Sequence, residues 1–127
     1  AAMQGMVVVP IFAGYDLRRA DGRLFTYDVT GGRYEERDYV ATGSGMLHAG
    51  TVIKLGWRDN LDRTAAITLA CRGLWEAADA DSATGGPDPL RGIYPVIASI
   101  TASGWERVPD PELVAIFESI AAEVRNR

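Results

Sequence analysis

The apolar segment at residues 6–15 constrains the fold more than any other part of the sequence. It reads MVVVPIFAGY, which is rich in β-branched residues and lacks polar alternation. A strand with one buried face would alternate between apolar and polar residues, so this pattern predicts a strand covered on both faces. Pro10 has no backbone N–H and marks an edge position or a bulge. We therefore expect a fold with layers on either side of a sheet.

Two further strands are expected after this segment. Asp21-Gly22 forms a turn into residues 23–29, where apolar and polar side chains alternate. Gly31-Gly32 turns the chain again before a less regular strand at residues 34–41. Consecutive strands joined by short turns predict an antiparallel meander.

Three amphipathic helices are predicted from apolar residues at helical spacing. The first follows Ser44, a natural N-cap, and carries an apolar stripe as far as Trp57. The second occupies residues 61–79. The third begins at Asp110, which is expected to cap it, with Pro111 at the first helical position.

Two other segments complete the expected secondary structure. Residues 93–101 predict a strand, and residues 105–108 predict its hairpin partner. At the amino terminus, residues 1–5 resemble the last turn of a helix closed by a glycine, so the sequence is expected to start within an element.

Length and composition predict a single domain over residues 1–127, because 47% hydrophobic residues suffice for one core. The net charge is −4 and the basic residues are scattered, which argues against a nucleic-acid partner. There is no apolar run long enough to span a membrane and no export signal. The single Cys71 is expected to be a core residue in a reducing compartment, so we expect a cytoplasmic protein.

The loop at residues 79–92 is the strongest candidate for a functional site. Asp81 and Thr84 stand three residues apart, so that a carboxylate and a hydroxyl can face the same point. The glycines that follow, Gly85-Gly86, allow backbone N–H groups to approach a ligand closely. The alternative is a structural Asx-turn that joins a helix to a strand.

A second candidate feature is the tripeptide Gly43-Ser44-Gly45 before the first predicted helix. The free N–H groups of a first helical turn can hold an anion or a chain terminus. His48 has no second histidine or cysteine at a ligand spacing, so a surface or packing role is favoured over metal binding.

Taken in this order, the meander, Gly43-Ser44-Gly45, the two helices and the segments 81–86 and 91–95 resemble the carboxyl-terminal part of a proteasome β subunit of the actinobacterial type. The segment 81–86 reads DSATGG and the segment 91–95 reads RGIYP. The resemblance covers nearly the whole chain. It implies an N-terminal nucleophile hydrolase fold, in which two antiparallel sheets lie between layers of helices. The chain is accordingly expected to be α+β, a partial αββα sandwich that lacks the leading strands and first helices of the family.

The resemblance implies that the nucleophile in this family is a threonine at the mature amino terminus, and that its own α-amino group is the base. An acid and a lysine early in the chain tune that threonine. This sequence has no matching motif for these groups, and its first threonine, Thr26, lies inside a predicted strand. Asp81, Thr84 and Ser44 match the supporting residues around the nucleophile's amino group, with Thr84 where many members have serine. No metal or organic cofactor is implied.

For the complete protein, the resemblance implies a threonine protease that degrades unfolded proteins inside stacked rings of α and β subunits. This chain alone is expected to be an inactive fragment that self-associates, because the absent half would leave apolar surface uncovered. Two alternatives remain open from the sequence: a naturally short, non-catalytic assembly or scaffold protein of the same fold, and a small-ligand module that uses Gly43-Ser44-Gly45.

Overall fold

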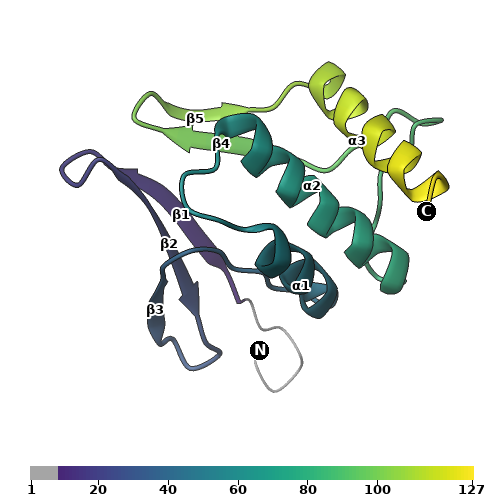
Figure 1. Ribbon diagram of the computed structural model, residues 1–127. Coiled ribbons are helices and arrows are strands. Elements are labelled where there is room, and N and C mark those ends of the chain that lie inside the picture. Colours follow the sequence, from purple (N-terminus) through teal and green to yellow (C-terminus); the bar gives the residue numbers. More distant parts are fainter. Residues whose placement is uncertain (1–8) are drawn as a thin grey trace.

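A computed structural model describes residues 9–127, which form an α+β fold of antiparallel strands and three helices (Figure 1). In chain order, the elements are β1 Ile11–Asp16, β2 Asp21–Tyr27, β3 Arg33–Glu36, α1 Met46–Gly56, α2 Arg63–Ala80, β4 Ala98–Thr101, β5 Gly104–Arg107 and α3 Asp110–Arg125. The expected helix end at residues 1–5 and the first three residues of the strand expected at 6–15 lie outside the described residues.

The strands β1, β2 and β3 form one sheet in that order, and both pairings are antiparallel. Phe12 lies opposite Phe25, and Thr26 lies opposite Tyr34. The predicted meander is therefore confirmed. The third strand is shorter than expected, because regular pairing ends at Glu36.

The strand β1 is not covered on both faces within the described chain. Val9, Ile11 and Phe12 are all exposed, and Phe12 keeps 60% of its accessible surface. Within β1, only the last three residues are partly buried. Within residues 9–127, the expected cover on both faces is therefore not present over the first half of β1.

A two-stranded sheet of β4 and β5 follows the helices, with Ile100 opposite Trp105. The strand expected at residues 93–101 begins only at Ala98. Before it, Asp88 and Ile93 exchange two backbone hydrogen bonds of 2.8 and 3.0 Å that close a turn. Gly92 in that turn has a φ of +67°, which other residues rarely adopt. The apolar composition of this segment was therefore a misleading signal for its first five residues.

The helices α1 and α2 pack closely at a glycine. Gly73 is buried, and a Cβ atom there would lie 3.4 Å from both the Ala49 carbonyl oxygen and Ile53 Cγ1. Such a distance is at the short end of ordinary contacts, so glycine lets the two helices approach. The contact lies within both helices and brings α1 close to α2.

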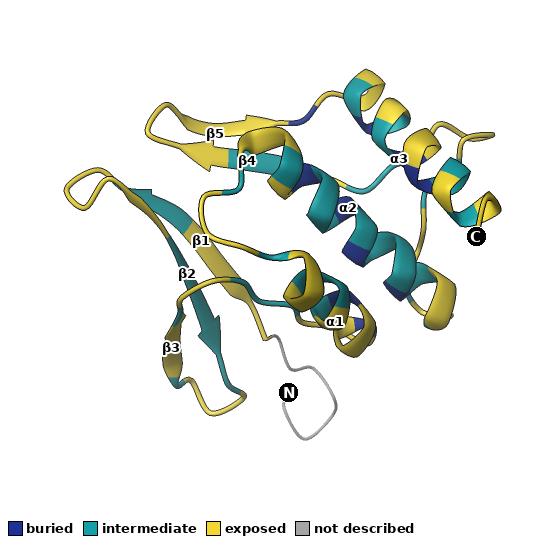
Figure 2. Ribbon diagram, viewed as in Figure 1, coloured by how far each residue is buried: buried dark blue, intermediate teal, exposed yellow. Residues whose placement is uncertain are grey.

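The main core lies where α2, α3 and the segments flanking the β4–β5 hairpin meet. Val108 and Leu113 are fully buried there, and Phe117 is 4% exposed. Figure 2 shows buried positions along α2 and on the side of α3 that faces it. Arg63–Glu112 and Arg72–Glu123 ion pairs join the two helices at the surface. No helix within residues 9–127 is long and apolar enough to cross a bilayer.

The expected cap of α3 is wrong in detail. Its N-cap is Pro109, without a side-chain hydrogen bond, and Asp110 is the first helical residue. Pro111 is therefore the second helical residue. A backbone N–H at this position would have no intrahelical acceptor, so the helix loses no hydrogen bond to proline here. Asp110 still lies in the first turn, where a negative charge favours the helix.

Truncating the core leucine of α3 tests this packing. We expect Leu113→Ala to lower the free energy of unfolding by about 2–5 kcal/mol, because Leu113 is fully buried and a cavity would remain. The matched control is Leu55→Ala on α1, where the side chain is 82% exposed and the change should stay within about 0.5 kcal/mol. Urea unfolding followed by circular dichroism measures both. Equal effects would contradict the assigned core.

Candidate functional site

The candidate site is built around Asp81, the residue that directly follows α2. Its backbone N–H donates to the Ala77 carbonyl oxygen at 2.8 Å and so closes the last turn of the helix. Its own backbone is extended, with φ at −120° and ψ at 114°. The chain therefore leaves the helix at Asp81, while the residue remains fixed by the helix.

One carboxylate oxygen of Asp81 accepts hydrogen bonds from two hydroxyls. Ser44 Oγ, from the segment just before α1, donates to Asp81 Oδ2. Thr84 Oγ1 donates to the same oxygen at 2.6 Å. The structure thus brings together all three site residues expected from the sequence, although 37 residues separate Ser44 from Asp81.

The other oxygen, Asp81 Oδ1, accepts the backbone N–H of Ala83 at 3.2 Å. The Asp81 carbonyl oxygen accepts the N–H of Thr84 at 3.0 Å. The bond from Ala83 to the side chain makes an Asx-turn, as the structural alternative predicted, although the strand expected to follow begins only at Ala98. The same carboxylate stabilises the turn with one oxygen and gathers the hydroxyls with the other.

These hydrogen bonds lower the pKa of Asp81 below its ordinary value of 3.8. The Ser44 hydroxyl makes the largest contribution, followed by Thr84 and then the Ala83 N–H. Partial burial opposes them, and the His48 imidazole adds a smaller electrostatic effect in the lowering direction. The carboxylate is therefore ionised at neutral pH and can only accept hydrogen bonds.

This arrangement determines which groups the cluster can bind. Ser44 and Thr84 each give their single hydroxyl proton to Asp81, so their oxygens have only lone pairs left for a third group. The cluster also carries one negative charge. It is therefore suited to bind a hydrogen-bond donor, above all an amine, and it is poorly suited to bind an anion.

Gly45 makes the close approach of these residues possible. It is buried, and a Cβ atom there would lie 2.8 Å from Thr84 Oγ1 and 2.9 Å from Ala77 Cβ. Its φ is −93°, so the requirement is for space and not for an unusual backbone. Sequence reasoning included Gly45 in a motif but missed this steric role. The only sequence signal for this close contact was weak: Ala77, a small residue, lies on the buried face of α2.

The expected capping role of Ser44 is wrong. The N-cap of α1 is Gly45, without a side-chain hydrogen bond, because the Ser44 hydroxyl is engaged by Asp81. His48 is exposed on the first turns of α1, in agreement with the expected surface role. Sequence reasoning did not anticipate its electrostatic effect on Asp81.

Two other candidate chemistries receive no support from the geometry. Cys71 is fully buried, and desolvation raises its pKa to about 11, so the thiol stays protonated. The prediction that Cys71 is a core residue is confirmed. Among residues 9–127, no three His, Cys, Asp or Glu side chains group in a way that could hold a metal ion.

The steric role of Gly45 can be tested through the pKa of Asp81. We expect Gly45→Ala to raise this pKa toward 3.8, because the added methyl group pushes the Ser44–Gly45 segment away from Asp81 and Thr84. The matched control is Gly85→Ala in the same loop, where an added Cβ meets nothing within 4 Å. Carboxyl ¹³C shifts followed by NMR during an acid titration measure the pKa of Asp81 in each variant.

The pH dependence of stability follows from the same shift. A lowered native pKa stabilises the fold above the pKa of the unfolded chain, and this contribution disappears as the pH falls through the native value. Gly45→Ala should therefore flatten the dependence of unfolding free energy on pH below about 4. An unchanged Asp81 pKa in Gly45→Ala, or equal shifts in both variants, would contradict the steric role.

Comparison with known proteins matches residues 1–88 to the family of proteasome subunits. The chain is 53% identical over 126 residues to the proteasome subunit beta of Acidimicrobium ferrooxidans. This matched region covers 99% of the chain and 46% of that protein. It is 52% identical to the proteasome subunit beta of Streptomyces griseus over 94% of the chain and 42% of that protein. For the proteasome subunit beta of Jonesia denitrificans, the identity is 50% over 94% of the chain and 40% of that protein.

The chain thus spans less than half the length of each of these curated relatives. The family match nevertheless covers most of the chain, and it includes Ser44, Asp81 and Thr84. The resemblance seen in the sequence is therefore confirmed: this chain belongs to the proteasome subunit family.

Proposed function

We propose that this chain is the carboxyl-terminal part of a proteasome β subunit, and that Ser44, Asp81 and Thr84 support a threonine nucleophile supplied by the other part. The observation that carries the proposal is the pair of hydroxyls sharing one Asp81 oxygen. Such a cluster accepts hydrogen bonds and donates none, which is what the amino group of an N-terminal nucleophile needs from its surroundings.

The chemistry of this proposal follows from the hydrogen-bond inventory. A neutral α-amino group carries two N–H donors and one lone pair. If acceptors on Ser44 and Asp81 hold the N–H groups, the lone pair is left to face the threonine hydroxyl and remove its proton. The amine then becomes an ammonium group, and the negative charge of Asp81 stabilises it. Asp81 thus acts by positioning the base and by compensating its charge.

The complete subunit would be a threonine-type endopeptidase that hydrolyses peptide bonds of unfolded proteins. The relatives bear the name proteasome subunit beta, which supports assembly with other β subunits and with α subunits. We place such a particle in the cytoplasm. The single-domain organisation proposed for residues 1–127 would be one portion of the subunit, and this portion alone would be inactive because it supplies no nucleophile.

The partial sandwich is also part of this proposal. Val9, Ile11 and Phe12 at the start of β1 are apolar and exposed. Exposed apolar strands usually have a partner in the functional protein. In the complete αββα fold, segments outside this chain would cover them, which agrees with relatives of more than twice its length.

The proposed role of Asp81 predicts a specific loss of activity. In the complete subunit, Asp81→Asn should slow peptide hydrolysis by about tenfold or more, because the amide lacks the charge and one acceptor. The control is Asp79→Asn, an exposed acid at the end of α2 outside the cluster. Turnover of a fluorogenic peptide by the assembled particle measures both. Unchanged turnover in Asp81→Asn would refute the assignment.

The exposed start of β1 predicts that the isolated chain self-associates. We expect a dimer or a larger assembly at micromolar concentration, because copies can cover one another's apolar strands. Phe12→Asp should shift the distribution toward monomer, since Phe12 is 60% exposed on that strand. Multi-angle light scattering after gel filtration gives the mass. A single monomeric peak for the unmodified chain would contradict this expectation.

A further inference from the structure

The loop after α2 folds back along the helix that it leaves. Asp81 follows the last turn of α2, and further along the loop Gly86 lies against Ala78, which precedes Asp81 by one turn of the same helix. Residues three apart on a helix are neighbours on one face, so the loop returns over the face that ends at Asp81. The segment that carries Thr84 is therefore held at both of its ends.

The contact between Gly86 and Ala78 has no room for a side chain. A Cβ atom at Gly86 would lie 3.1 Å from Ala78 Cβ, whereas carbon atoms in contact prefer about 3.5–4.0 Å. The methyl group of Ala78 has no second rotamer, so it moves only with the helix backbone. That backbone is fixed by the hydrogen bond from the Asp81 N–H to the Ala77 carbonyl oxygen at 2.8 Å. A methyl group added at Gly86 would therefore displace the loop and not the helix.

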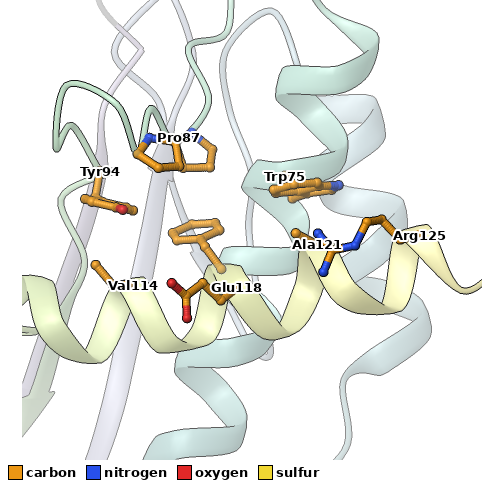
Figure 3. A pocket seen from close by; sticks show the side chains of 9 residues that line it. Trp75, Pro87, Tyr94, Val114, Glu118, Ala121 and Arg125 are labelled. Carbon is orange, nitrogen blue, oxygen red and sulfur yellow. The ribbon is translucent and has the colours of Figure 1, made fainter.

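Pro87, the next residue, limits how the loop can respond. It is half-buried, and together with Trp75 and Tyr94 it lines a pocket of about 460 Å³ (Figure 3). The proline ring fixes its own φ and restricts the conformation of the residue before it. On the other side of Gly86, towards Thr84, the chain is exposed at Gly85. A displacement of Gly86 is therefore taken up on the side of Thr84.

The Thr84 hydroxyl has little freedom to follow such a displacement. Thr84 Oγ1 donates to Asp81 Oδ2 at 2.6 Å, and the Thr84 N–H donates to the Asp81 carbonyl oxygen at 3.0 Å. A Cβ atom at Gly45 would lie only 2.8 Å from Thr84 Oγ1, so Gly45 confines the hydroxyl closely. A shift of the loop thus changes the length or the direction of the bond to Asp81, and hydrogen bonds weaken as they stretch and bend.

We propose that Gly86 is a positioning residue for the Asp81 cluster: by lying against Ala78 without a side chain, it holds the Thr84 hydroxyl on Asp81 Oδ2. In that position the hydroxyl gives its proton to the carboxylate and leaves its lone pairs for an incoming amine. The inference rests on the proposed function, in which the cluster holds the amino group of a threonine nucleophile. It assigns Gly86 a steric role that the sequence pattern does not indicate.

The first test measures the pKa of Asp81 in the 127-residue chain by carboxyl ¹³C NMR. Gly86→Ala should raise this pKa toward 3.8, because the Thr84 hydrogen bond that helps to lower it becomes weaker. The matched control Gly85→Ala should leave the pKa unchanged, because a Cβ atom there meets nothing within 4 Å. Neither glycine has a positive φ, so alanine adds no backbone strain at either position.

A double variant separates positioning from a general loss of stability. Ala78→Gly removes the methyl group that Gly86→Ala would meet, so the chain with both substitutions should regain the lowered pKa of Asp81. By itself Ala78→Gly lowers stability, because glycine weakens a helix. A recovered pKa in a less stable chain cannot result from stability, and it would identify the contact between these two residues as the cause.

In the complete, assembled subunit, the contact should affect kcat more than KM. Gly86→Ala should lower kcat for a fluorogenic peptide about threefold and change KM by less than about twofold, because it misplaces a group beside the base and not beside the bound peptide. Adding Ala78→Gly should recover most of the lost kcat.

Three NMR results would overturn the positioning role: an unchanged Asp81 pKa in Gly86→Ala, equal shifts in Gly86→Ala and Gly85→Ala, and no recovery in the double variant. Equal turnover by Gly86→Ala and the unmodified particle, in an assay where Asp81→Asn is slow, would also overturn it. The proposed function fails separately, through unchanged turnover in Asp81→Asn, and the NMR measurements then still decide whether Gly86 positions Thr84.

Discussion

The hydrogen bonds that converge on the Asp81 carboxylate join parts of the chain that are distant in sequence. Ser44 binds it from the entrance to α1, Thr84 binds it from the loop after α2, and the Ala83 N–H completes the turn. Because both hydroxyls give their protons to one oxygen, the cluster presents lone pairs and negative charge to any third group. Its capacity to hold an amine is thus a consequence of how the loop is stabilised.

The small residues between the helices allow these bonds to form. Gly73 lets α1 and α2 approach, while the lack of a Cβ atom at Gly45 leaves room for Thr84 Oγ1 and Ala77 Cβ. On the opposite side, α2 packs against α3 through the main core around Leu113. The helix α2 therefore holds Asp81 at its end and contributes Ile67 and Cys71 to the main core.

The helices could be predicted from the sequence because their apolar residues recur at helical spacing and their packing agrees with that pattern. The resemblance of their motifs also singled out Ser44, Asp81 and Thr84, which the structure joins by hydrogen bonds; their role in a site stays a prediction. Two local patterns were misleading. Ser44 resembles an N-cap, but its hydroxyl donates to the distant Asp81. Residues 93–97 resemble a strand, but Ile93 pairs with the nearby Asp88 and closes a turn. The steric role of Gly45 was beyond sequence reasoning, because it depends on where Thr84 and Ala77 lie in space.

We propose that the Asp81 cluster receives the amino group of a threonine from the other part of the subunit. An experimental structure of the complete, processed subunit would give the position of its α-amino nitrogen. We expect this nitrogen within about 3.5 Å of Ser44 Oγ or of an Asp81 carboxylate oxygen. An amino nitrogen held by other residues and remote from the Asp81 cluster would exclude this role.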